Sequence, residues 1–418
     1  METRLADFVR GTHAGEVAEA ILRKCVHCGF CTATCPTYQL LGDELDGPRG
    51  RIYLIKQVLE GKPASEKTRL HLDRCLSCRS CESTCPSGVK YTRLLDIGRA
   101  LVEQQLPRTF KESLPRTLLS EVLPRSELFS RLVSLGRAVR PLLPNILADK
   151  LPAAGEGLRS RPVSRHHARR MLLLSGCVQP AMAPNINAAT VRVCDALGIT
   201  LFETAKAGCC GALRHHLTEQ ERALDDMRRN IDAWWPEVEQ GIEGIVVTAS
   251  GCGVHVREYG HLLAEDSRYA EKAARIAALC RDPAEVVAAE SSRLRALLGT
   301  SRRGKLAFHA PCTLQHGLKL DGTVEALLQL AGYELTAVAD KHLCCGSAGA
   351  YALLQPTIAG QLRERKLDAL HAGGAEKIAT ANIGCMNHLQ AGAEMPVRHW
   401  IELIDEALLD NSPRKDGV

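Results

Sequence analysis

Two short cysteine runs have the most specific chemistry in this sequence of 418 residues. Each has the spacing C-x2-C-x2-C-x3-C-P, which is typical of proteins that hold a pair of [4Fe-4S] clusters. Three cysteines within seven residues can reach three corners of one cubane, and the fourth, after its own turn, reaches the other cubane. We therefore predict two neighbouring clusters with crossed ligands, the first on Cys25, Cys28, Cys31 and Cys85, and the second on Cys75, Cys78, Cys81 and Cys35.

Tetrahedral zinc is the alternative for these eight thiols. Structural zinc sites typically separate two C-x2-4-C pairs by a longer loop. Each run here instead places four cysteines within eleven residues, which favours clusters. A [4Fe-4S] cluster passes one electron at a time, so a close pair is expected to conduct electrons rather than transform a substrate.

A second set of cysteines repeats in the C-terminal half. Each unit has one cysteine, then a Cys-Cys-Gly triplet, then a later cysteine followed three residues on by a histidine. Equivalent positions lie 135 residues apart for the first three cysteines and 133 apart for the last cysteine and the histidine, which indicates a duplicated unit. The candidate ligands are Cys177, Cys209, Cys210, Cys252 and His255 in the first unit, and Cys312, Cys344, Cys345, Cys385 and His388 in the second.

The sequence leaves open which metal, if any, these units bind. Adjacent cysteines rarely pair in a disulfide because so short a ring is strained, so each triplet is expected to converge on a metal, its glycine allowing close backbone approach. The histidines could ligate iron or zinc through neutral imidazole, or be structural. A further iron-sulfur cluster, zinc or no metal are the possibilities. Cys194 and Cys280 have no counterpart in the other unit and are expected to be buried, inert thiols.

The elements that position these cysteines follow from apolar patterning. Short β-branched runs at 245–249 and 377–381 alternate with helical patterns at 219–235 and 361–371, which predicts βαβ units with parallel strands. The cysteines then follow strand ends, where open α/β sheets place ligands and helix N-termini favour thiolate. Between the two N-terminal runs, the residues 48–61 predict an amphipathic helix ending at a glycine.

The segment 106–170 lacks cysteine and is strongly basic. It has 13 Lys and Arg against five Asp and Glu, so its own excess of positive charge is larger than the net charge of +5 of the whole chain. Its prolines are expected to break long helices and leave short amphipathic pieces such as 126–135. We interpret it as a solvated linker; the alternative is a docking face for an acidic partner or an anionic membrane surface.

Composition narrows the class of protein. Aromatic residues are only 4%, too few for base-stacking platforms, so nucleic-acid binding is not expected. No apolar run reaches the length of a membrane span, and the first residues lack the apolar core of a secretory signal. The 18 cysteines therefore fit a cytoplasmic chain in which thiols stay reduced and serve as metal ligands.

The predicted fold is α+β and multidomain, with an N-terminal α-helical dicluster ferredoxin domain followed by two tandem α/β units. A chain of this length is expected to form two to four domains. The predicted ranges are 1–105 for the ferredoxin domain, 106–170 for the basic linker, 171–300 for the first Cys-Cys-Gly unit and 301–410 for the second.

These motifs resemble known families. The helical insertion between the two runs resembles the ferredoxin module of respiratory dehydrogenase iron-sulfur subunits. The two Cys-Cys-Gly (CCG) units resemble the cysteine-rich domain found in heterodisulfide reductase, in the iron-sulfur component of glycerol-3-phosphate dehydrogenase and in lactate-utilisation iron-sulfur proteins. A dicluster module followed by two such units is similar to the iron-sulfur subunits of bacterial glycolate oxidase. The sequence departs from heterodisulfide reductase in ending each unit with C-x-x-H rather than C-x-x-C, which puts its non-cubane cluster in doubt here.

The resemblance implies an electron-transfer subunit of a glycolate oxidase complex. FAD would lie on partner subunits that oxidise glycolate to glyoxylate, and electrons would pass to a quinone or another membrane acceptor, with the chain peripherally associated with the inner membrane. The chain itself lacks a G-x-G-x-x-G after a strand, so no Rossmann-type flavin site is expected in it. Three alternatives stay open: the same role with D-lactate or glycerol 3-phosphate, a thiol-disulfide reductase, and a non-catalytic metal scaffold.

Overall fold

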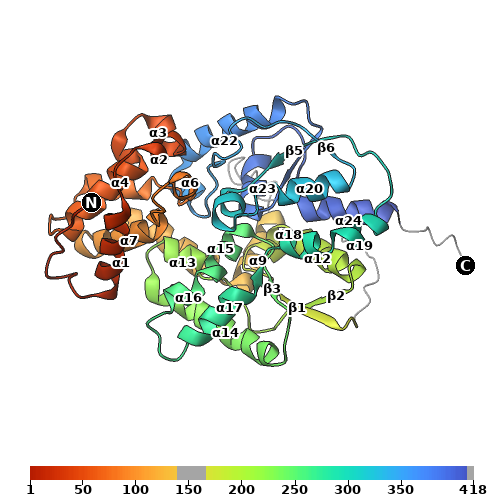
Figure 1. Ribbon diagram of the computed structural model, residues 1–418, viewed down its shortest axis with the longest axis horizontal. Helices are drawn as coiled ribbons and strands as arrows, with labels where there is room; N and C mark the ends of the chain where they lie inside the picture. Colours follow the sequence, from red (N-terminus) through yellow and green to blue (C-terminus); the bar gives the residue numbers. More distant parts are fainter. Residues whose placement is uncertain (139–165, 412–418) are drawn as a thin grey trace, which may run out of the picture.

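The computed structural model describes residues 1–138 and 166–411. The N-terminal part is helical, and Figure 1 shows it in red and orange beside the two later units. Its core consists of apolar residues from α1, α4 and α7 together with Cys25, Cys75 and Cys81. Its elements are α1 (His13–Lys24), α2 (Phe30–Ala33), α3 (Pro36–Leu41), η1 (Glu44–Asp46), α4 (Pro48–Leu59), α5 (Glu66–Asp73), α6 (Ser80–Thr84) and α7 (Tyr91–Gln105).

Helix α4 matches the helix predicted between the two cysteine runs. It begins at Pro48, whose fixed φ suits a first turn, and Gly61 follows it with a φ of +94°. Its apolar face packs on α7, where a Cβ at Gly98 would lie 2.6 Å from Ile55. This close approach packs the helix that lies between the two cysteine runs on the helix that follows the second run.

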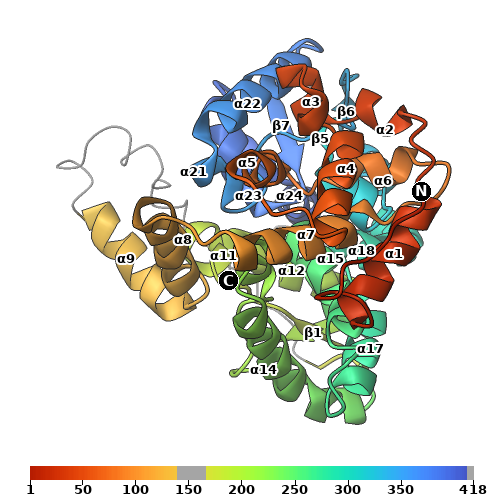
Figure 2. The ribbon, with the colours of Figure 1, turned by 90° about the vertical axis from the view of Figure 1, so that its left-hand side faces the viewer.

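Two helices follow, α8 (Phe110–Val122) and α9 (Ser126–Ala138). The second covers the predicted amphipathic piece. Helix α8 differs from expectation because it continues through Pro115. The proline-containing run at 140–145 lies outside the described residues. Figure 2 shows α8 and α9 together at one side of the molecule.

Each later unit contains a four-stranded sheet in which every strand pair is parallel. The orders are β2-β1-β3-β4 and β6-β5-β7-β8, so both units have one topology. The predicted fold class is thereby confirmed. The strands are β1 (Arg169–Leu173), β2 (Ile199–Phe202), β3 (Ile245–Val246), β4 (Cys280–Arg281), β5 (Lys305–His309), β6 (Glu334–Leu335), β7 (Lys377–Thr380) and β8 (Val397–His399).

Helices cover the two sheets, and α14 and α22 contain the predicted helical patterns. The first unit has α11 (Gln179–Met182), α12 (Pro184–Ala196), α13 (Ala212–His216), α14 (Gln220–Glu239), α15 (Ser250–Arg257), α16 (Tyr259–Leu262), α17 (Ala270–Leu279), α18 (Pro283–Ala289) and α19 (Ser291–Leu297). The second has η3 (Thr313–Gly317), α20 (Thr323–Leu330), α21 (Tyr351–Leu354), α22 (Pro356–His371), α23 (Ile383–Gln390) and α24 (Trp400–Asp410).

The two units share a hydrophobic core. Helix α12 of the first unit packs on α24 of the second, and one buried cluster contains residues from both. Arg192 on α12 and Asp405 on α24 form a buried ion pair with N–O distances of 2.7 to 3.1 Å. The two duplicated units therefore pack tightly against each other through a shared hydrophobic core.

Candidate metal centres

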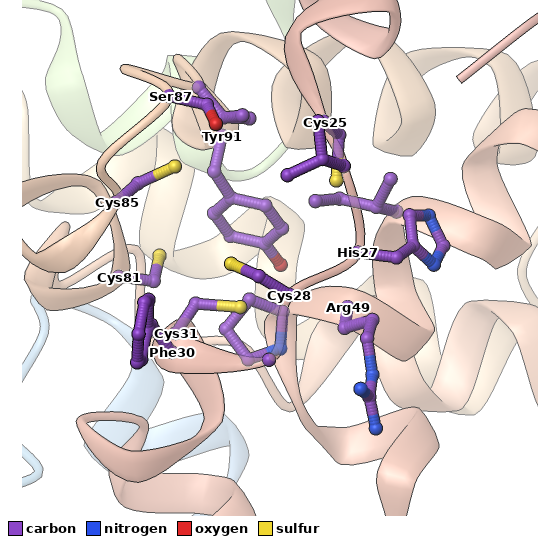
Figure 3. Close-up of a pocket in the computed structure, with 15 residues that line it drawn as sticks. Cys25, His27, Cys28, Phe30, Cys31, Arg49, Cys81, Cys85, Ser87 and Tyr91 are labelled. Atoms are coloured by element: carbon purple, nitrogen blue, oxygen red, sulfur yellow. The ribbon is translucent and has the colours of Figure 1, made fainter.

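The first pocket lies between α2, α4 and α6. Figure 3 shows the sulfur atoms of Cys25, Cys28, Cys31 and Cys85 facing one space beside the ring of Tyr91. Cys28 is exposed, and Val26 and Phe30 beside it are 69% and 61% exposed. One side of this pocket therefore opens to solvent.

The second pocket adjoins the first. It is lined by Cys35, Cys75, Cys78 and Cys81, and it shares Pro48, Cys81 and Tyr91 with the first pocket. Apart from the shared Cys81, the first pocket contains three cysteines of the first run with Cys85 of the second. The second pocket contains three cysteines of the second run, Cys81 included, with Cys35 of the first, so both pockets agree with the crossed-ligand prediction. The shared wall makes the two spaces close neighbours.

The backbone of both runs adopts the same unusual conformation. His27 and Gly29 in the first run have φ values of +55° and +86°, and Ser77 and Arg79 in the second have +52° and +62°. Three of these four are not glycine, for which positive φ is uncommon and strained. Such strain in both loops around the thiols is typical of a functional site.

The spacing of the thiols tests which metal group fits. Among the described residues, only two groups of three or more ligand side chains have their ligand atoms within 4.8 Å of one another, and none of the eight ferredoxin cysteines belongs to either. A single zinc ion needs four ligand atoms that close, whereas a four-iron cubane holds its thiolates further apart. The two pockets therefore fit clusters better than zinc.

Buried groups around the second pocket affect its electrostatics. Arg51 is 1% exposed, donates to the carbonyl oxygen of His71 at 2.7 Å and pairs with Asp46 at 3.4 Å. The Tyr91 hydroxyl donates to Cys75 Sγ at 3.5 Å. A buried cation and a hydrogen bond to sulfur both favour the more negative, reduced state of a cluster.

In the first CCG unit the four cysteines meet at the carboxyl ends of the central strands. Cys177 follows β1, Cys252 lies in the first turn of α15 after β3, and the triplet lies between them. Hydrogen bonds join the thiols in the order Cys177, Cys209, Cys210 and Cys252. Gly211 has a φ of +91°, and its N–H donates to Cys209 Sγ at 3.5 Å, so the triplet needs its glycine.

The second unit repeats this arrangement. The Sγ atoms of Cys312 and Cys344 are 3.9 Å apart, and Cys345 hydrogen-bonds to both Cys344 and Cys385. Gly346 has a φ of +93°, and its N–H donates to Cys344 Sγ at 3.4 Å. The hydrogen bond with Cys344 lowers the pKa of Cys345, but the hydrogen bond with Cys385 and burial outweigh it and raise this pKa well above its ordinary value. A bound metal would have to displace the thiol protons.

The predicted histidines lie in different surroundings. The ring of His255 packs 5.3 Å from that of His215 and 6.4 Å from that of His216. The Nε2 atom of His388 lies 3.2 Å from the carbonyl oxygen of Ala359, to which it donates. The structure instead brings His309 to Cys345 and Cys385, with the ligand atoms of all three within 4.8 Å of one another.

Sequence reasoning missed His309 because the search followed positions common to both units. The signal was available in Phe308-His309-Ala310-Pro311-Cys312, where a histidine precedes a predicted ligand by three residues. Cys194 and Cys280 lie in the buried apolar clusters around the first sheet. Burial raises the pKa of each thiol to about 12, as expected for inert cysteines.

The second pocket contacts the second CCG unit directly. Leu76 and Cys78 belong to one packed cluster with Cys312, Cys344 and Tyr351. The Tyr351 hydroxyl donates to the carbonyl oxygen of Arg74 at 3.0 Å. The thiols therefore form a continuous series from the first pocket through the second to the second unit.

Comparison with known proteins identifies the family. Residues 21–89 match the 4Fe-4S dicluster domain, and residues 171–257 and 306–390 match the cysteine-rich domain CCG. The glycolate oxidase iron-sulfur subunit of Escherichia coli (strain K12) is 54% identical over 408 residues, covering 98% of this chain and 99% of that protein. The chain belongs to the family of glycolate oxidase iron-sulfur subunits.

Other relatives agree with this placement. The probable glycolate oxidase iron-sulfur subunit of Bacillus subtilis (strain 168) is 30% identical over 90% of each chain. Lactate utilization protein A of the same organism is 25% identical over 228 residues, 53% of this chain and 90% of that protein. The glycolate oxidase iron-sulfur subunit family therefore covers both the dicluster part and the CCG units.

Membership of the glycolate oxidase iron-sulfur subunit family confirms several sequence predictions. The chain is an iron-sulfur, electron-transferring subunit of an oxidoreductase, with a dicluster ferredoxin domain and two CCG units. In the part of the chain that the structure describes, every helix is too short or too polar to cross a membrane.

Proposed function

We propose that this chain conducts electrons released by glycolate oxidation on FAD-containing partner subunits. Its first [4Fe-4S] cluster is held by Cys25, Cys28, Cys31 and Cys85, and its second by Cys75, Cys78, Cys81 and Cys35. The observation that supports this most is the continuous series of thiols from the open first pocket to the second CCG unit.

The direction of transfer follows from exposure. The first pocket opens to solvent beside Val26 and Phe30, so it is the side where a flavin subunit docks. The second pocket is covered by the second unit, so its cluster receives electrons from the first cluster rather than from outside. A reduced flavin gives up two electrons, and two one-electron clusters take them in turn.

The CCG units are the next stage. Their buried thiols fit a further iron-sulfur cluster or zinc. If the second unit holds an iron-sulfur cluster, electrons pass on through it. If it holds zinc, electrons leave the chain from the second [4Fe-4S] cluster. The final acceptor is a quinone or another membrane acceptor.

The basic segment favours peripheral association with an anionic membrane surface, the inner membrane in the cell. Helix α8 exposes an apolar stripe at Phe110, Leu114 and Leu118, and α9 exposes one at Leu128, Leu132 and Leu135. The stripes accompany the excess positive charge of the segment 106–170. Apolar faces flanked by basic residues bind anionic lipid surfaces.

Reconstitution tests the electron-transfer role. The isolated chain should not oxidise glycolate, whereas adding it to the flavin-bearing partner subunits should connect glycolate oxidation to an electron acceptor. Cys28→Ser or Cys78→Ser should break this connection and leave glycolate binding by the partners unchanged, and Cys194→Ala serves as a control. D-lactate and glycerol 3-phosphate in parallel identify the substrate. Full turnover without this chain would refute the proposal.

A further inference from the structure

The two CCG units have different residues at one position beside their cysteines. In the second unit His309 ends β5, three residues before Cys312. The equivalent residue in the first unit is Leu174, three residues before Cys177. Leu174 packs in an apolar cluster with Cys210 and Cys252. Where the first unit places a leucine against its thiols, the second therefore places an imidazole.

Among the residues that the structure describes, no hydrogen-bond partner explains the burial of His309. Its residue exposure is 2%, and neither ring nitrogen has a hydrogen-bond partner among the described residues. A buried polar group without a partner destabilises the folded state, so this burial needs an explanation.

The thiols face this imidazole at the position where the fold binds ligands. His309 ends β5, and Cys385 lies in the first turn of α23 after the neighbouring β7. The strand order β6-β5-β7-β8 makes this the point where the sheet topology switches sides, and open parallel sheets bind ligands there. One nitrogen and two sulfurs lie within 4.8 Å of one another.

This spacing is close to what one metal ion needs. Ligand atoms around a tetrahedral zinc lie roughly 3.5–4 Å apart, given Zn–S near 2.3 Å and Zn–N near 2.0 Å. Cys344 supplies a further sulfur because its thiol hydrogen-bonds to Cys345 and lies 3.9 Å from Cys312 Sγ. With Cys345 and Cys385, Cys344 would give the site three sulfurs beside the nitrogen of His309.

We propose that His309 is a metal ligand of the second CCG unit, together with Cys345, Cys385 and Cys344, and that the first unit has no ligand at the equivalent position, where Leu174 stands. The metal is thiophilic, either zinc or the iron of a cluster. His388 lies outside the group of ligand atoms within 4.8 Å of one another, and its ring hydrogen-bonds to the backbone of Ala359 and Cys345, so the proposed site uses His309 in its place. This inference rests on the proposed function, in which the CCG units follow the two cubanes on the electron path.

Metal analysis of the anaerobically purified whole chain tests the proposal. Wild-type protein should contain metal beyond the eight irons of two cubanes. X-ray absorption at the edge of that metal should show one nitrogen neighbour. His309→Leu, which gives the second unit the residue of the first, should lower the affinity for this metal about tenfold or more. A fall in zinc identifies a zinc site, and a fall in iron identifies a cluster.

Two further variants keep the result decisive. His388→Leu is the matched control and should retain the metal and its nitrogen neighbour. His309→Cys should retain the metal but replace the nitrogen by sulfur, which a purely structural role of His309 would not do. The electron paramagnetic resonance signals of the two cubanes should be unchanged in all three variants, which separates this test from that of electron transfer.

Three results would overturn the assignment. These are wild-type protein without metal beyond the two cubanes, His309→Leu with the nitrogen neighbour intact, and loss of the metal from His388→Leu. Should His309→Leu fail to fold, His309→Cys decides: retained metal with a sulfur neighbour supports ligation, and lost metal refutes it. Glycolate-driven reduction of the cubanes is expected in every one of these cases.

Discussion

At the scale of single residues, the position of Cys85 supports the proposed sharing of ligands between the two runs. It lies in the first pocket with Cys25, Cys28 and Cys31, although it ends the second run. The preceding Cys81 lies on α6 and faces the wall common to both pockets. A short helix thus separates two ligands only four residues apart in sequence.

Replacing Cys85 by Ser should perturb the first cluster, whereas Cys75→Ser should perturb the second. The expected outcome follows from their pockets, since Cys85 lines the first and Cys75 the second. Spectroscopy of the reduced variants checks it, with Cys25→Ser as the reference for the first cluster. Loss of the same cluster from Cys85→Ser and Cys75→Ser would contradict the crossed assignment.

At the scale of elements, α8 combines an exposed apolar stripe with a basic segment. Phe110, Leu114 and Leu118 are 76%, 44% and 55% exposed and lie four residues apart. Replacing these three by Ser should reduce binding of the chain to anionic phospholipid vesicles severalfold, because the buried apolar area is lost. Co-sedimentation measures the change, and neutral vesicles are the control. Equal binding by both proteins would rule out this face.

The N-cap residue of helix α18, Asp282, should make the free energy of unfolding depend on pH. Asp282 accepts from the Ala284 N–H at 2.8 Å through Oδ1, but its buried Oδ2 has no hydrogen-bond partner among the described residues. Burial raises the pKa of Asp282 to about 7 from an ordinary value of 3.8. The folded state therefore binds this proton more tightly than the unfolded state, so the free energy of unfolding falls as pH rises through this window.

Asp282→Asn should remove that loss and keep the Oδ1 cap. Relative to wild type, the variant should gain about 2 kcal/mol in free energy of unfolding between pH 5 and pH 8. Denaturant unfolding of both proteins at the two pH values measures this gain. A difference between the two proteins that does not change with pH would show that Asp282 does not titrate in this range.

At the scale of the whole molecule, the buried ion pair of Arg192 and Asp405 joins the two CCG units. Arg192→Ala leaves the Asp405 carboxylate buried and unpaired, which should cost about 3–5 kcal/mol in free energy of unfolding. The double variant Arg192→Met with Asp405→Leu should recover most of this loss, because no charge stays buried. Denaturant unfolding of the three proteins checks both expectations. Equal stability of Arg192→Ala and wild type would contradict this role.

Local sequence patterns were enough to predict several elements and the repeated cysteine motifs. The spacing of the cysteine runs predicted a dicluster ferredoxin domain, because a local turn limits which thiols can reach one cubane. Apolar periodicity predicted α4, α14 and α22, and the 135-residue repeat predicted two units of one topology. These features depend on neighbours close in sequence, so they can be read without knowing how distant segments pack.

Only the tertiary structure decided how the sites relate to one another. The contact of Cys78 with Cys312 and Cys344 joins segments more than two hundred residues apart, and no local pattern specifies it. The histidines show the same limit: His388 matched His255 in sequence, yet its ring bonds to a backbone carbonyl while His309 reaches the thiols. Packing of whole elements sets which side chains converge, because the orientation of each helix and strand depends on the entire core.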